Sequence, residues 1–319
     1  MPFARCRFFF NLQLMTTYLN KQPFALQLLF LLLWLFMGTV LASLISFVAI
    51  LVVTGGDLNS VVDGTGMDAL FENMTVLKVV QIFASIATFV VPAVGFAIMK
   101  KRKWLEYVQL NKELKTPAGI FSIFIIVFAF PLILLLLQLN GQLILPEALN
   151  GLENWMLAQE EAAAELTLLF LKMDTVGALI LNLILVGVVP AFSEELLFRG
   201  VIQQFLMEWT KRPHLAILLA GIIFSFFHFQ FYGFLPRMVL GMFLGYLFYW
   251  SGNLWYPILA HFFNNGSQVM LVYFGQMDAS EAAKDAPPLD SNFFITFGIS
   301  TLLLIGSIVI FKRLVKHQK

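Results

Sequence analysis

Residues 188–200 read VVPAFSEELLFRG and place two adjacent glutamates and an arginine inside an otherwise apolar run. The preceding residues, 176–187, read VGALILNLILVG and contain no charged side chain. Such a run predicts an apolar helix, and ionisable side chains inside an apolar helix are costly and therefore candidates for a functional site. The stretch thus points to a membrane fold and asks what Glu194, Glu195 and Arg199 do there.

Composition supports the same fold class. The chain has 319 residues, of which 60% are hydrophobic and 12% are charged, whereas a soluble domain carries about 25% charged residues. The sequence therefore predicts an all-α polytopic membrane protein, and the few polar side chains within its apolar segments are candidates for a polar catalytic site inside the helix bundle. A net charge of +1 gives no reason to expect nucleic acid, and the single cysteine, Cys6, excludes an intrachain disulfide framework and a cysteine-based zinc site.

About eight transmembrane helices are expected, because several apolar runs approach or exceed the ~20 residues that cross a bilayer. The first run is longer than the apolar region of a signal peptide, so we expect it to remain as an anchor. The fourth continues as a motif-bearing segment to about residue 207. The predicted spans are 25–53, 77–99, 118–138, 176–198, 214–230, 236–250, 255–274 and 292–311.

Basic and acidic connecting segments alternate along the chain. With eight spans, every basic cluster falls on one side, and the positive-inside rule then places both termini in the cytoplasm. The absence of an organelle-retention signal favours a bacterial plasma membrane. The basic clusters include Arg5, Arg7 and Lys21, the lysines at 100–115, residues 211–212 and the residues after 311, and the acidic segments lie at 57–72, 147–165 and 278–290.

Four regions are expected along the chain. Residues 1–140 form N-terminal transmembrane scaffold helices, because their spans contain almost no ionisable residues. Residues 141–175 form an extracytoplasmic loop, in which an acidic segment of helical composition predicts a surface helix. Residues 176–275 hold the catalytic core. Residues 276–319 hold an outer loop, the last transmembrane helix and a basic cytoplasmic tail.

Three polar groups interrupt the apolar helices of the expected core, and helical spacing relates their members. Glu195 and Arg199 are four residues apart, so they share a face and can form an ion pair, whereas Glu194 is rotated by about 100° from Glu195. A buried carboxylate beside a like charge suits a general base.

The other two groups lie further along the chain. His228 occurs in FSFFHF and supplies another titratable group. His261 and Asn265 occur in LAHFFNN and are also four residues apart. They can act as a donor pair for an anion that develops in a transition state.

Less specific interpretations exist for each group. Ser193 could cap a helix whose first turn holds the two glutamates, His228 could form an interhelical hydrogen bond, and Asn265 could stabilise helix packing. Two histidines and two glutamates could also bind zinc, although no H-E-x-x-H motif is present. A single buried site accounts for all three polar groups at once.

The three groups together resemble the CPBP family of CAAX proteases and bacteriocin-processing enzymes, also called the Abi family. Order and spacing match over roughly residues 176–275. The family motif E-E-x-x-x-R corresponds to Glu194, Glu195 and Arg199, F-x-x-x-H corresponds to Phe224 and His228, and H-x-x-x-N corresponds to His261 and Asn265.

The resemblance implies an intramembrane glutamic endopeptidase. It implies that Glu194 and His228 activate a water molecule and that His261 and Asn265 stabilise the oxyanion. Glu195, Arg199 and Phe224 would be supporting residues. No cofactor is expected, with a zinc ion as the alternative.

The expected partners are the lipid bilayer and a membrane-associated substrate, such as a prenylated CAAX protein or a bacteriocin leader. A non-catalytic immunity or scaffold protein on the same fold is the main alternative function. A transporter with a buried proton or ion relay is a further one.

Overall fold

The computed structural model describes residues 19–101, 103–277 and 291–316. These residues form helices and connecting turns, with no β-strand among them, which confirms the all-α polytopic fold. Arg5, Cys6, Arg7 and the acidic segment 278–290 lie outside the described residues.

Helices occupy all eight predicted segments. Five helical runs among the described residues are long and apolar enough to cross a membrane: α2 (Phe24–Val53), the run Met74–Lys100, α8 (Thr116–Gly141), the run Val176–Thr210 and α17 (Phe293–Val315). The other three are α13 (Pro213–Phe226), α14 (Phe234–Ser251) and α15 (Trp255–Tyr273). α13 is shorter than the ~20 residues of a typical span, and α15 carries His261, Asn264 and Asn265.

The chain divides into two compact units, which are described separately. The first comprises residues up to Lys112 together with Phe192–Ile202. Its elements before Lys112 are α2, α3 (Asn59–Val62), α4 (Thr65–Glu72), α5 (Met74–Ser85), the π-helical η1 (Ile86–Val90), α6 (Val91–Lys100) and α7 (Trp104–Tyr107).

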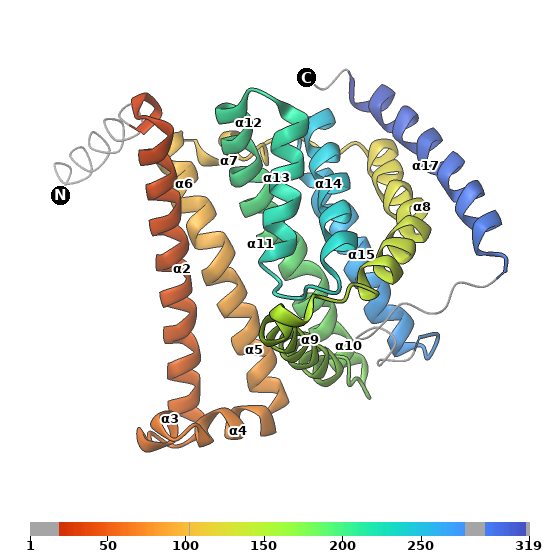
Figure 1. Ribbon diagram of the computed structural model, residues 1–319. Helices are drawn as coiled ribbons and strands as arrows, with labels where there is room; N and C mark the ends of the chain where they lie inside the picture. Colours follow the sequence, from red (N-terminus) through yellow and green to blue (C-terminus); the bar gives the residue numbers. More distant parts are fainter. Residues whose placement is uncertain (1–18, 102, 278–290, 317–319) are drawn as a thin grey trace. The chain divides into compact units, whose positions relative to one another are not determined.

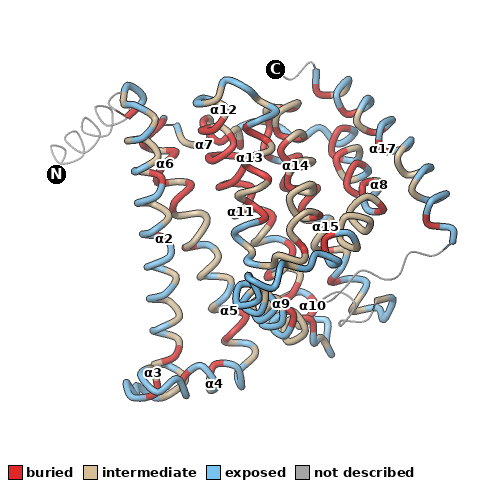
Figure 2. The backbone as a smooth tube through the Cα atoms, in the orientation of Figure 1, coloured by how far each residue is buried: buried red, intermediate tan, exposed pale blue. Residues whose placement is uncertain are grey.

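In the first unit, α2 packs along α5, η1 and α6 through small residues. A Cβ atom on Gly38 would lie 2.7 Å from Ala87 O, and one on Gly95 would lie 2.6 Å from the Trp34 ring. Glycine therefore permits the close approach. Figure 2 shows that most of α2 is exposed or only partly buried. Because α2 is apolar throughout, this exposed surface suits contact with lipid.

The second unit comprises Glu113–Ala191 and Gln203–Lys319. α17 and α14 pack on α8, and α13 packs on α14 (Figure 1). α8 and α15 also pack together. Gly245 on α14 lies so close to α13 that a Cβ atom there would be 3.1 Å from Ile217 Cγ2. Gly245 thus marks close packing between α13 and α14.

Residues 188–200, which hold Glu194, Glu195 and Arg199, are helical throughout. It belongs to the run α10 (Val176–Asn182), η3 (Leu183–Val188), α11 (Val189–Leu197), η4 (Phe198–Gln203) and α12 (Gln204–Thr210), in which η3 and η4 are π-helical. Pro190 does not break the helix: the run Val176–Thr210 continues through it, and the π-helical η3 ends just before it. Ser193 lies inside α11, so the interpretation of Ser193 as an N-cap is wrong. π-Helical turns are often found at functional sites.

Two further predictions concern segments of the second unit. The predicted surface helix is α9 (Asn150–Phe170), preceded by the 3-10 turn η2 (Glu147–Leu149). α9 buries only Ala164, which fits a surface position. The expectation that helix five extends to residue 230 is wrong, because α13 ends at Phe226 and His228 lies in the following turn.

Candidate active site

Glu195 and Arg199 form a buried ion pair in the first unit. Arg199 Nη1 donates to Glu195 Oε1 at 2.6 Å, and the two side chains are 0% and 1% exposed. The i,i+4 spacing on a helix brings them onto one face. Glu194 precedes them on α11 and is partly buried. The cluster therefore places the positive charge of Arg199 near two carboxylates in an apolar surrounding. Charges buried in this way lose their hydration, so they are tolerated when they are paired with an opposite charge.

His228 is oriented by the end of α13 in the second unit. Its Nδ1 atom lies 2.9 Å from Phe224 O, and the Phe224 ring meets the imidazole edge-on, with centroids 5.0 Å apart. Because a carbonyl oxygen can only accept, Nδ1 carries the proton in this bond and Nε2 of the neutral ring is an acceptor. The F-x-x-x-H spacing therefore sets both the ring orientation and the tautomer.

Asn265 is held by the main chain of η3. Its Nδ2 atom donates to Val186 O at 3.0 Å and lies 3.2 Å from His261 Nε2. Pro190 stands four residues after Val186 and has no N–H, so it cannot make the α-helical bond to that oxygen. The proline thus leaves this acceptor for the amide of Asn265.

Phe224 joins the two histidine groups. Its ring centroid lies 6.1 Å from that of His261, in an edge-on arrangement, and it also contacts His228. The structure therefore brings Phe224, His228, His261 and Asn265 together in the second unit, from α13, the turn after it and α15. Glu194, Glu195 and Arg199 form their own cluster in the first unit.

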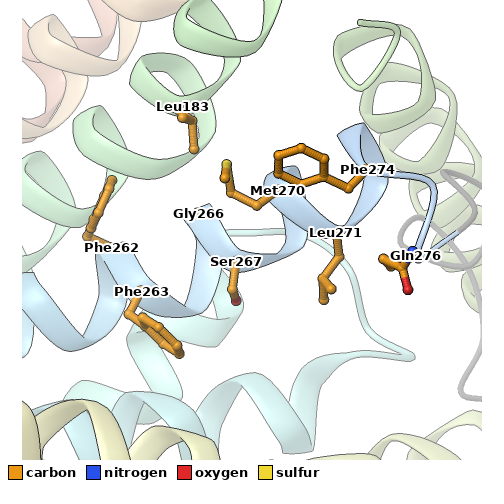
Figure 3. Close-up of a pocket in the computed structure, with 9 residues that line it drawn as sticks. All are labelled: Leu183, Phe262, Phe263, Gly266, Ser267, Met270, Leu271, Phe274 and Gln276. Atoms are coloured by element: carbon orange, nitrogen blue, oxygen red, sulfur yellow. The ribbon is translucent and has the colours of Figure 1, made fainter.

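A pocket of about 480 Å³ lies against α15, next to the residues His261 and Asn265. Figure 3 shows its lining residues along α15 from Phe262 onward and in the turn that follows the helix, with Leu183 of η3 near them. Phe262 and Gly266 are the sequence neighbours of His261 and Asn265. This pocket was not predicted from the sequence, although the apolar residues at helical spacing after Asn265 are a signal of it. The lining consists of Leu183, Phe262, Phe263, Gly266, Ser267, Met270, Leu271, Phe274 and Gln276.

No group of three or more His, Cys, Asp or Glu side chains arranged to hold a metal ion occurs in the described part of the chain. The zinc ion considered in the sequence analysis stays an alternative prediction.

Comparison with known proteins places a family match on the same segment. Residues 176–267 match the family described as type II CAAX prenyl endopeptidase Rce1-like. The match contains all three motifs and confirms the resemblance to the CPBP family. A Bacillus subtilis (strain 168) relative, described as uncharacterized protein YpbD, is 34% identical over 85 residues. The aligned part covers 25% of this chain and 40% of the relative, so the chain spans about two-fifths of its length. No solved structure matches the chain.

Proposed function

From the premise that residues 176–267 carry an Rce1-like CAAX protease domain, we propose that the protein is an intramembrane endopeptidase. It hydrolyses a peptide bond of a membrane-associated protein or peptide. The observation that carries this proposal is the meeting of Phe224, His228, His261 and Asn265 on α13, its following turn and α15, inside the matched segment.

Glu194 and His228 activate the attacking water. Glu194 accepts a proton from the water as the oxygen attacks the scissile carbonyl carbon, and His228 Nε2 orients that water as a hydrogen-bond acceptor. Collapse of the tetrahedral intermediate breaks the C–N bond. The proton held by Glu194 then passes to the leaving amine. The Phe224 O bond to Nδ1 supports this role, because it leaves Nε2 as the accepting atom.

His261 and Asn265 stabilise the oxyanion of the tetrahedral intermediate. Donors fixed in advance are worth most where the site excludes water, and removing one donor costs about 10²- to 10³-fold in kcat in a well-studied protease. Val186 O holds one Asn265 N–H, which supports a fixed orientation of the amide. The second N–H lies on the side of His261 and can donate to the substrate oxygen once the ring turns or takes up a proton.

The buried Glu195–Arg199 pair supports the neighbouring catalytic carboxylate. It fixes the local helix geometry and balances charge in the apolar surrounding. Catalysis by the glutamate without a metal ion is the version we favour. If zinc is required instead, chelation removes activity and added zinc restores it.

The pocket on α15 suits an apolar group of the substrate. Its position next to His261 and Asn265 in the sequence supports binding of a hydrocarbon group close to the scissile bond. A prenyl chain of a CAAX-type protein or an apolar segment of a leader peptide fits this description.

The test compares peptide termini in membranes that contain the wild type, Glu194→Gln or His228→Ala. Both variants should lose cleavage while the folded protein is retained in detergent. Glu208→Gln on α12 and His214→Ala on α13 are matched controls, because they change the same residue types outside the motifs, and they should cleave normally. Normal cleavage by both motif variants would leave a non-catalytic immunity or scaffold role as the better explanation.

A further inference from the structure

The turn that carries His228 joins α13 to α14 and spans residues 227–233. Phe229 in this turn has a φ of 53°, in the left-handed region that residues other than glycine rarely adopt. A backbone in this conformation persists where its surroundings hold it. The contacts of the turn therefore decide where the imidazole of His228 lies.

Asn140, near the C-terminus of α8, links the end of the 227–233 turn to the start of α14. Its Nδ2 atom donates to Phe231 O at 2.8 Å, and its Oδ1 atom accepts from Leu235 N at 2.7 Å. The side chain is 1% exposed. One buried amide thus accepts from the Leu235 N–H, which lies in the first turn of α14 and has no acceptor within the helix, and adds a second donor to Phe231 O, which also accepts from Phe234 N at 3.2 Å. Replacing Asn140 would leave the Leu235 N–H without its acceptor.

The acidic surface helix α9 contacts the same turn from another side. Glu160 Oε2 accepts from Tyr232 N at 3.3 Å, and Glu153 Oε1 accepts from Tyr232 Oη at 3.4 Å. The Trp155 ring lies against Phe231, with centroids 5.4 Å apart. Figure 1 shows α9 crossing below the connection between α13 and α14. The two hydrogen bonds from α9 are longer than those of Asn140, so we expect them to contribute less to the stability of the turn.

The turn is also closed on itself. Ser225 Oγ donates to Phe234 O at 2.7 Å. The guanidinium of Arg237 donates to Gln230 O at 3.1 Å and to Gln230 Oε1 at 3.0 Å. Arg237 thereby braces this turn from α14. Contacts from α8, α9 and α14 therefore leave the segment after His228 one conformation.

We propose that Asn140 is a positioning residue for His228, and that the α9 face of Glu153, Trp155 and Glu160 is a second, weaker positioning element. The proposal rests on the proposed role of His228 in activating water. A reacting group displaced by about 1 Å can lose about 100-fold in rate. The surface helix α9 thereby acts on the reaction through the turn that carries His228.

Asn140→Ala tests the stronger element, and Asn253→Ala is its matched control. Asn253 is buried and also makes two such bonds, donating to Glu113 O at 2.9 Å and accepting from Trp255 N at 3.0 Å. Both variants remove the same chemistry and should lose similar stability. Only Asn140→Ala should lower kcat, by at least about 10-fold, with KM within about two-fold of the wild type.

Hydrogen exchange supplies a readout that does not depend on activity. The Leu235 amide should exchange faster in Asn140→Ala, because it loses its acceptor, and should stay protected in Asn253→Ala. Asn140→Asp keeps an acceptor for Leu235 N and should restore part of the protection. On α9, Glu160→Ala should lower kcat by about 2- to 5-fold, and Glu160→Gln, which keeps an acceptor, should restore it.

Two results would overturn the proposal. One is a kcat close to the wild type in Asn140→Ala although Leu235 exchange is accelerated. The other is an equal loss of kcat in Asn253→Ala, which would indicate general destabilisation. Full cleavage by His228→Ala is a different failure, because it removes the proposed function itself. The exchange measurement separates the two failures, since it reports on the turn whether or not His228 is catalytic.

Discussion

The side-chain amide of Asn265 donates a hydrogen bond to the main-chain oxygen of Val186 at 3.0 Å. Gly187 allows the helices to approach here, because a Cβ atom on it would lie 3.1 Å from the Phe262 ring of α15. Pro190 supplies no N–H to compete for this oxygen. Pro190 in α11 therefore helps to keep Val186 O available as the acceptor for Asn265 in α15.

Pro190→Ala should weaken the hold on Asn265. The new N–H of residue 190 competes for Val186 O, and a competed hydrogen bond of about 1 kcal/mol corresponds to a fall in kcat of about 3- to 10-fold. Thermal stability should stay equal or rise, because the helix gains a donor. Cleavage rates and melting temperatures in detergent check both outcomes.

Pro131→Ala is the control for this change, because Pro131 lies inside α8. It also restores a helical N–H, so it should leave the cleavage rate unchanged. If both proline variants lower kcat equally, the effect belongs to helix geometry in general and not to the bond between Asn265 and Val186.

Arg199→Leu should be strongly destabilising. The change leaves Glu195 buried with its ion partner removed, which typically costs about 3–5 kcal/mol. The double variant Glu195→Leu/Arg199→Leu should regain much of this stability, because no buried charge of that pair remains. Unfolding of the purified variants in detergent measures the difference. If Arg199→Leu has the same melting temperature as the wild type, the pair contributes nothing to the stability of the fold.

Met270→Trp should narrow the pocket on α15. If the pocket holds an apolar substrate group, KM should rise by about 10-fold with a smaller change in kcat, because substrate binding is lost while the reacting groups stay in place. Gln268→Trp adds the same ring to an exposed position of α15 outside the pocket lining. Equal kinetics in the two variants would argue against the pocket as a substrate site.

The sequence predicts those features that depend on local composition. The helix positions follow from apolar length, the surface position of α9 follows from its acidic residues, and the pair Glu195–Arg199 follows from the i,i+4 spacing. The three motifs likewise identify the segment that the family comparison matches.

Other features depend on contacts between distant residues. The bond between Asn265 and Val186 joins positions 79 apart, and that between Asn140 and Leu235 joins positions 95 apart. The π-helical turns η3 and η4 also change which side chains share a face, and 3.6-residue spacing gives no sign of them. The predicted end of the fifth helix, at residue 230, is wrong for another reason. The turn after Phe226 is as apolar and aromatic as the helix, so composition gives no sign that the helix ends there.

The turn after His228 should respond to alkaline pH through Tyr232. Burial of the phenol, followed by the charge and hydrogen bond of Glu153 and the charge of Glu160, raises the pKa of Tyr232 above its usual value of 10.0. The folded state thus favours the neutral phenol, so its contribution to stability is fully present below pH 10 and is lost as pH rises through the raised pKa. The ultraviolet titration difference between wild type and Tyr232→Phe should have a midpoint above 10.0, and Glu153→Ala should lower it. A midpoint at the usual value in the wild type would mean that α9 does not contact the turn in solution.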